Sequence, residues 1–161
     1  MAKVAQYYRV VVEILYTTGN RISELSAMKK EDINRSERSI LITKGKRKKS
    51  RIVLFTRECG EQLSRYLKGW EDDMPTVFVN ITGKRAICHR TVQKKLAEYG
   101  GQLCMKIPPH TLRHTFAARL AMKAMPLSCI QVLLRHKELQ PMLLYARLYD
   151  HAHKEIYDQF M

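Results

Sequence analysis

The run Pro109-His110-Thr111-Leu112-Arg113-His114 contains two side chains that can act on a phosphate group. His110 and Arg113 are three positions apart, so in a helix they share a face. An imidazole can transfer a proton, and a guanidinium can bind two oxygens of one phosphate. The pair alone is a weak signal, because a histidine and an arginine at this spacing are more often a surface pair without a role.

Four further segments carry residues that suit the same chemistry. They are the run Thr18-Gly19-Asn20-Arg21-Ile22-Ser23-Glu24-Leu25, the pair Lys44-Gly45, the run Leu133-Leu134-Arg135-His136, and Tyr145, nine positions after His136. Together with the His110–His114 run, they resemble in order the motifs of the tyrosine recombinases, the phage integrase family. That family has an arginine motif, a lysine between two strands, an H-x-x-R-H segment, a leucine–glycine–histidine motif and a tyrosine. The resemblance covers essentially the whole chain.

The resemblance implies that Tyr145 is the nucleophile. A tyrosine that attacks the phosphorus of DNA keeps the phosphodiester energy in a 3′-phosphotyrosine bond, so rejoining needs no ATP. The attack places negative charge on the nonbridging oxygens. Arg21 and Arg113 would bind those oxygens and stabilise the charge in place of a metal ion. We therefore expect neither a metal nor an organic cofactor.

The resemblance also assigns the proton transfers. Lys44 would give a proton to the leaving 5′ oxygen, and His136 would hydrogen-bond the phosphate. A tyrosine has a pKa of about 10, so a neighbouring group must help it lose its proton. His110 is the candidate for that role.

Some of these assignments have competitors in the sequence. Tyr149 and Tyr157 could be the nucleophile, although the nine-residue spacing favours Tyr145. Lys46, Lys48 and Lys49 could replace Lys44 as the acid, although the Lys-Gly pair after a strand favours Lys44.

The neighbours of the motif arginines and histidines leave further questions open. Glu24 either braces Arg21 by an ion pair or is a helix-face charge, and His114 is expected to be structural. Arg135 stands where the family usually has glycine. A long cation beside His136 puts the local geometry there in question.

The elements that must hold these residues are mainly helical. Apolar spacing predicts helices near residues 3–18, 23–28, 57–70, 91–99, 110–122, 128–135, 141–149 and 151–160. Residues 40–42 and 51–55 read as two strands, and 77–79 as a short third strand. The fold class expected is mainly α with a small antiparallel β-sheet (α+β), like the catalytic domain of the recombinases. We expect one catalytic domain over 1–161, truncated before a DNA-clamping domain that family members usually carry at the N-terminus.

Charge points to the partner. Lysine and arginine number 29 against 15 acidic residues, which gives a formal net charge of +14. Such an excess is costly in a compact domain unless a polyanion binds it. We expect double-stranded DNA as the partner, with no membrane and no small-molecule substrate. The DNA backbone contacts expected from the basic loop and from one nearby helix are Lys46, Arg47, Lys48, Lys49, Arg51 and Arg90.

Cysteine spacing and hydropathy bound the cellular context. No apolar run approaches the roughly 20 residues of a membrane span. The four cysteines form no disulfide pattern, so a cytoplasmic protein, nucleoid-associated when acting, is expected. A zinc site from Cys88, His89, Cys104 and His110 would match no standard spacing.

The expected function is a site-specific DNA recombinase or integrase of a mobile genetic element. The alternatives are an inactive DNA-binding regulator on the same fold and a type IB topoisomerase. A metal-dependent nuclease would need clustered carboxylates, and Glu71-Asp72-Asp73 lies in an expected surface turn. The resemblance further implies a tetramer on paired DNA sites, joined through residues 151–161. The alternative is that this segment folds back on its own domain.

Overall fold

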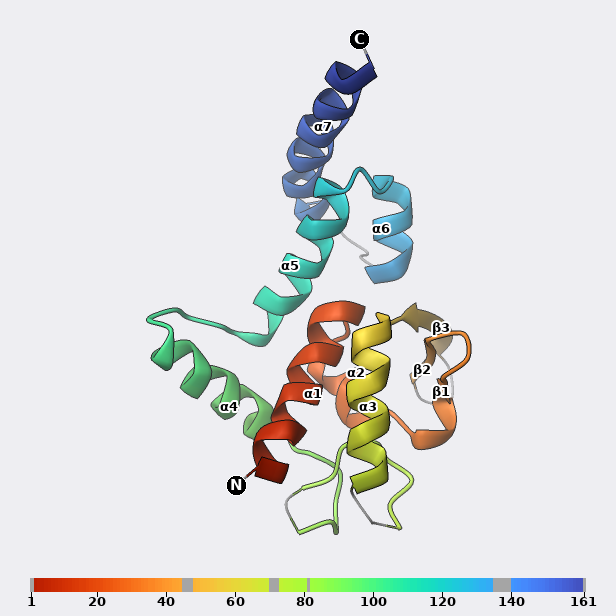
Figure 1. The fold of residues 1–161 in the computed structure, drawn as a ribbon, viewed down its shortest axis with the longest axis vertical. Helices are drawn as coiled ribbons and strands as arrows, with labels where there is room; N and C mark the ends of the chain where they lie inside the picture. The colour runs from red at the N-terminus through yellow and green to blue at the C-terminus, as the bar shows by residue number, and fades with distance from the viewer. Residues whose placement is uncertain (1, 45–47, 70–72, 81, 135–139, 161) are drawn as a thin grey trace.

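A computed structural model describes residues 2–44, 48–69, 73–80, 82–134 and 140–160. Helices dominate it, with one small sheet (Figure 1). The elements in chain order are α1 (Ala2–Thr18), α2 (Ile22–Ala27), η1 (Lys30–Asp32), β1 (Ile33–Asn34), β2 (Ser39–Lys44), β3 (Lys48–Leu54), α3 (Arg57–Gly69), α4 (His89–Gln102), α5 (Pro109–Met122), α6 (Leu127–Leu134) and α7 (Gln140–Phe160). This architecture confirms the expected fold class.

The sheet is antiparallel, with strand order β1-β2-β3. Ile40 pairs with Val53 and Ile42 with Arg51 across β2 and β3. Side chains alternate between the two faces of a strand, so Ile40, Ile42 and Val53 are buried. Ile52, the residue before Val53, is exposed. The same alternation places Arg51 on the buried face.

The expected strand at 77–79 is wrong. The third strand of the sheet is β1, and the 77–79 region contributes two isolated bridges, Lys29 with Thr76 and Val79 with Ala86. The segment is nevertheless core. Val77, Phe78 and Val79 are buried, and the Tyr7 and Tyr66 hydroxyls donate to the carbonyls of Val79 and Val77.

The core has two parts. The larger is built around α1 and includes residues of α3, the sheet and α4. The smaller lies between α5, α6 and α7, and its buried members are Ala117, Ala121, Ile130, Leu134 and Tyr145. Contacts between α1 and α5 link the two parts.

Gly19 fixes the turn that leads from α1 to α2. Its φ is +62°, a left-handed conformation that suits glycine after a helix. A Cβ at this position would lie 2.5 Å from Cδ1 of Phe116 and 2.9 Å from Cδ2 of Leu134. The turn therefore brings the backbone of Gly19 and Asn20 directly against α5 and α6.

The C-terminal helix differs from the two short helices expected at 141–149 and 151–160. It is one continuous helix, α7, whose first part packs on α5 and α6 and whose C-terminal end projects from the body (Figure 1). Its last turns expose Ile156, Tyr157 and Phe160. Across the described part of the chain, no helix is long and apolar enough to cross a bilayer.

Candidate active site

A cleft of about 200 Å³ opens where α2, α4 and α5 begin. Its lining includes Asn20, Arg21, His89, Gln93, His110 and Arg113. Three of the six predicted catalytic residues, Arg21, His110 and Arg113, thus meet although they lie up to 92 positions apart in the chain. The cleft also faces the N-terminus of α5, where free backbone N–H groups favour an anion.

Arg21 is held by Glu24. The Nη1 atom of Arg21 lies 3.5 Å from Oε1 of Glu24, and the Arg21 backbone N–H donates to Oε2 at 2.9 Å. The Glu24 side chain is only 3% exposed, whereas that of Arg21 is 35% exposed. The glutamate therefore braces Arg21 and is not a solvent-facing helix charge, which settles the alternative left open by the sequence.

Arg113 is buried at the floor of the cleft. Its guanidinium donates to the carbonyl oxygens of Gly19 and Leu134, so it ties α5 to the turn after α1 and to the end of α6. Burial, followed by the positive charges of Arg21 and Arg51, lowers the pKa of Arg113 to about 10. The side chain therefore remains charged at neutral pH.

Arg51, expected to contact the DNA backbone, points into the protein. Its side chain is 6% exposed, and Nη2 lies 2.8 Å from Oε2 of Glu24. Nη2 also donates to Oδ1 of Asn20, and Nη1 donates to the Leu133 carbonyl, both at 3.0 Å. The strand alternation turns this arginine inward with Val53, toward the buried carboxylate, so its guanidinium is not exposed for the expected backbone contact.

Tyr145 lies in the smaller core, with its ring 1% exposed. Its hydroxyl lies 2.6 Å from Nδ1 of His114. Burial raises the pKa of Tyr145, so the hydroxyl is protonated at neutral pH. The pKa of His114 is lowered by partial burial and by the neighbouring His110 and Arg113. A neutral His114 can therefore accept the hydrogen bond that Tyr145 donates.

Comparison with known proteins identifies the family. The profile described as "Phage integrase family" matches residues 2–152. The chain belongs to the phage integrase family. The tyrosine recombinase XerA of Pyrococcus furiosus is 34% identical over 142 residues, which cover 87% of this chain and 50% of that protein. The chain thus spans about half the length of the curated relatives it matches.

Solved structures in the integrase family share the fold. The crystal structure of XerA recombinase matches 99% of this chain and 63% of that chain, with a TM-score of 0.80 and 27% identity. The XerH site-specific recombinase, bound to palindromic difH substrate in a post-cleavage complex, matches 98% of this chain and 46% of that chain. Its TM-score is 0.79, with 25% identity.

The remaining integrase-motif positions are only partly covered by the structure. Lys44 ends β2 and pairs in the hairpin with Lys48, but the side chains of Lys44, Lys48 and Lys49 are not described. His136, Arg135, Lys46 and Arg47 lie outside the described residues. Arg90 is exposed in the first turn of α4, next to His89 of the cleft.

Two residues of this integrase site were missed or undervalued from the sequence. His114, expected to be structural, contacts the hydroxyl that His110 was expected to contact. The alternation of Arg51 with Val53 and Phe55 was the available signal that Arg51 faces inward. For His114 the signal was its place on the same helix, four positions after His110, which puts the two histidines on one face.

Among the residues that the structure describes, no three His, Cys, Asp or Glu side chains are grouped so that they could hold a metal ion. Cys59 is a buried free thiol, and Cys88, Cys104 and Cys129 are exposed free thiols. The charged groups described at the site are arginines and the one glutamate between them.

Proposed function

We propose that this chain is the catalytic domain of a tyrosine site-specific recombinase or integrase, which cleaves and rejoins DNA through Tyr145. The observation that carries the proposal is the cleft in which Arg21, His110 and Arg113 converge, with the Tyr145 hydroxyl 2.6 Å from His114, the residue that follows Arg113 on α5. Family membership supports the same chemistry. The chain would act in the cytoplasm, at the nucleoid, where it would recombine DNA sites of a mobile genetic element or a chromosome.

The proposed reaction balances without a cofactor. A DNA phosphate sits in the cleft, where Arg21 and Arg113 bind its nonbridging oxygens. The Tyr145 hydroxyl gives its proton to His110 and its oxygen bonds to phosphorus. The bond from phosphorus to the 5′ oxygen breaks, and Lys44 protonates that oxygen. The product is a 3′-phosphotyrosine and a free 5′ hydroxyl. Attack by a 5′ hydroxyl from another strand reverses each step and reseals the DNA.

Tyr145 must move before it reacts. Its hydroxyl is hydrogen-bonded to His114 in the small core, and Tyr145 is not among the residues that line the cleft. Its raised pKa also keeps it protonated. DNA binding would have to bring the hydroxyl toward Arg113 and His110, where the arginine charges favour the phenolate. The resting enzyme would thus be protected from cleaving phosphates at random.

Double-stranded DNA is the proposed substrate. The net charge of +14 and the lysine-rich segment between the two strands would supply backbone contacts. They are proposed for Lys46 and Arg47 in the sequence between β2 and β3, for Lys48 and Lys49 of β3, and for Arg90 beside the cleft. Phosphate contacts release counterions, so affinity should fall steeply with salt. The XerH relative was crystallised on its difH substrate, which supports the same class of partner.

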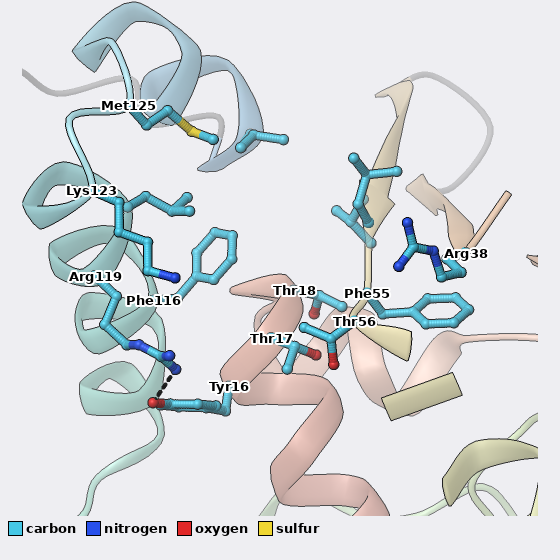
Figure 2. A pocket seen from close by; sticks show the side chains of 14 residues that line it. Tyr16, Thr17, Thr18, Arg38, Phe55, Thr56, Phe116, Arg119, Lys123 and Met125 are labelled. Atoms are coloured by element: carbon cyan, nitrogen blue, oxygen red, sulfur yellow. Dashed lines mark hydrogen bonds between the residues drawn. The ribbon is translucent and has the colours of Figure 1, made fainter. Parts of the chain in front are cut away.

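The second partner proposed is another copy of the chain, bound on the same DNA. The end of α7 exposes Ile156, Tyr157 and Phe160, which would be unfavourable in a helix that stays in water. A largely apolar groove of about 380 Å³ lies between α1, β3 and α5, with Phe55 and Phe116 among its walls (Figure 2). The end of α7 from a second copy would fill this groove. Such a head-to-tail contact closes a ring, as a tetramer on paired sites requires.

The test is covalent trapping on a pool of duplexes that carry one nick beside randomised sequence. Cleavage next to the nick releases a short strand, so the adduct cannot reseal and accumulates. We expect a denaturant-resistant protein–DNA adduct that forms in the presence of a chelator and is absent in Tyr145→Phe. Tyr149→Phe and Tyr157→Phe should still trap DNA, as controls. The phenylalanine ring keeps the packing of Tyr145, and loss of one hydrogen bond costs only about 1 kcal/mol of stability.

The same experiment separates the alternatives. An inactive DNA-binding regulator would bind the pool and form no adduct. A type IB topoisomerase would form the adduct and also relax supercoiled plasmid without joining strands between duplexes. An adduct that persists in Tyr145→Phe would refute the assignment of the nucleophile.

A further inference from the structure

Glu24 lies between two arginines. One of its oxygens, Oε2, contacts both Nη2 of Arg51 at 2.8 Å and the backbone N–H of Arg21 at 2.9 Å. The other, Oε1, lies 3.5 Å from Nη1 of Arg21. The closer charge–charge contact is therefore with Arg51, although Arg21 is the residue that lines the cleft.

The sharing of the Glu24 carboxylate between Arg51 and Arg21 affects the phosphate site. A buried carboxylate needs a positive partner, because its desolvation is otherwise very unfavourable. Arg51 supplies that partner from the buried face of β3. Without Arg51, Glu24 would draw more strongly on the guanidinium of Arg21, which already lies 3.5 Å away and would turn from the cleft toward the carboxylate. Arg51 thus leaves Arg21 free to bind a phosphate oxygen.

Arg51 also works in parallel with Arg113. Arg51 donates to the Leu133 carbonyl and to the side chain of Asn20, and Arg113 donates to the Leu134 carbonyl and to the Gly19 carbonyl. The two arginines therefore join the same two segments at consecutive residues. The carbonyls at the end of a helix lack partners within that helix, and cations stabilise them.

We infer that Arg51 is a positioning residue of the phosphate site, acting through Glu24 and through the end of α6. It is not a cleft-lining residue, so it acts on Arg21 without touching the substrate. The inference rests on the proposed function, because the role it describes is the presentation of Arg21 to a DNA phosphate. Arg51 would complete a set of three arginines and one glutamate, whose net positive charge suits the doubly charged phosphorane of the transition state.

The first test compares single-turnover cleavage in variants of the pair. Arg51→Met should slow adduct formation on the order of 10²-fold, as loss of a transition-state donor does in other enzymes. DNA affinity should change much less, because Arg51 does not contact DNA. Adding Glu24→Gln to Arg51→Met should restore at least a tenth of the lost rate, since the unpaired carboxylate that captures Arg21 is gone. Losses that simply multiply in the double variant would overturn the inference.

A matched control uses an exposed pair of the same type. Arg57 and Glu61 form an i,i+4 ion pair on α3, with side chains 81% and 54% exposed. Arg57→Met and Glu61→Gln should leave the cleavage rate unchanged. Arg51→Lys serves where Arg51→Met does not fold, because it keeps the charge beside Glu24. Arg51→Lys should cleave at least tenfold faster than Arg51→Met. If Arg51→Met is unfolded, Arg51→Lys should retain at least a tenth of the wild-type rate. Slower cleavage by Arg51→Lys would overturn the charge argument.

The second test replaces a nonbridging oxygen of the scissile phosphate by a methyl group. This methylphosphonate carries no negative charge, so it has little need of Arg21. Arg51→Met should therefore lose much less rate on the methylphosphonate duplex than on the phosphate duplex. Equal losses on both would mean a merely structural role and would overturn only the inference about Arg51. A wild-type chain without any Tyr145-dependent adduct would refute the proposed function and this inference together.

Discussion

At the scale of single residues, the proposed nucleophile and its neighbour form a resting pair. Tyr145 and His114 are hydrogen-bonded, and the pKa of each is shifted toward the neutral form. Burial is the main cause of both shifts. The charge of Arg113 adds to the lowering of the His114 pKa, whereas it favours an anionic Tyr145 and so opposes the rise that burial causes in the Tyr145 pKa. The sequence motif predicted Tyr145 and Arg113 but assigned the contact with the hydroxyl to His110.

The lowered pKa of His114 predicts how stability depends on pH. The unfolded chain has a histidine pKa of about 6.5, and the folded chain a lower one. Between these values the unfolded state binds more protons, so the free energy of unfolding should fall as pH drops below about 6.5. Urea titrations of the wild type and of His114→Gln should show a smaller fall in the variant. Parallel curves for the two proteins would contradict the shift.

At the scale of elements, the Gly19 turn determines where the first arginine motif lies. A side chain at Gly19 would meet Phe116 and Leu134, and the backbone there is left-handed. The same turn presents the carbonyl of Gly19 to Arg113 and the side chain of Asn20 to Arg51. Packing of α1 against α5 and α6 and the geometry of the cleft are therefore coupled.

Gly19→Ala should be strongly destabilising. The left-handed conformation costs about 1 kcal/mol or more for alanine, and the crowding against Phe116 adds about 1–3 kcal/mol. Gly101→Ala is the matched control, because a Cβ there meets no atom within 4 Å and the residue lies in a helix. That control should be neutral or slightly stabilising. Equal unfolding free energies for the two variants would disprove the packing argument.

The elements also show what the sequence could predict. Periodic apolar residues placed α1 and α3 closely, because each of these helices has a buried face and a solvent face. The proline at its start marked where α5 begins. The periodicity rule failed at residues 77–79, whose buried, apolar side chains belong to a loop with only isolated bridges. It also divided α7 in two, because the polar residues around Asp150 resemble a break that the backbone does not make.

The candidate site was predictable where motifs carry it and not where long-range contacts do. Arg21, His110 and Arg113 were assigned from short local patterns and converge in one cleft. The inward position of Arg51 was missed because its partner Glu24 is 27 residues away, and charge in a basic segment reads as a surface feature. The alternation with Val53 and Phe55 indicates the inward face, and the pairing register of the sheet places Arg51 there.

At the scale of the whole molecule, the end of α7 and the groove beside α5 are separate surfaces of one chain. An apolar helix end and a distinct apolar groove favour contact between copies over contact within one copy, because α7 points away from the body (Figure 1). The chain alone should be monomeric, and paired DNA sites should bring the copies together.

Phe160→Lys should prevent this assembly and leave cleavage intact. Phe160 is 84% exposed, so the change costs little stability. In the groove, a lysine would lose the apolar contact and would meet the positive charges of Arg119 and Lys123, which is unfavourable. Light scattering on DNA that carries two sites should show tetramers for the wild type and smaller complexes for the variant. Leu103→Lys, at an exposed apolar residue after α4, is the control and should assemble normally. Tetramers of Phe160→Lys would disprove the role of α7.

The central claim is that Tyr145 forms a bond to the 3′ phosphate of a broken DNA strand. The most direct measurement is mass spectrometry of the trapped adduct after digestion with protease and nuclease, together with labelling of the released strand end. We predict a nucleotide 3′-phosphate on the peptide that contains Tyr145, and a 5′ hydroxyl that a kinase labels without prior phosphatase. A linkage through a 5′ phosphate, or through any other residue, would contradict the account.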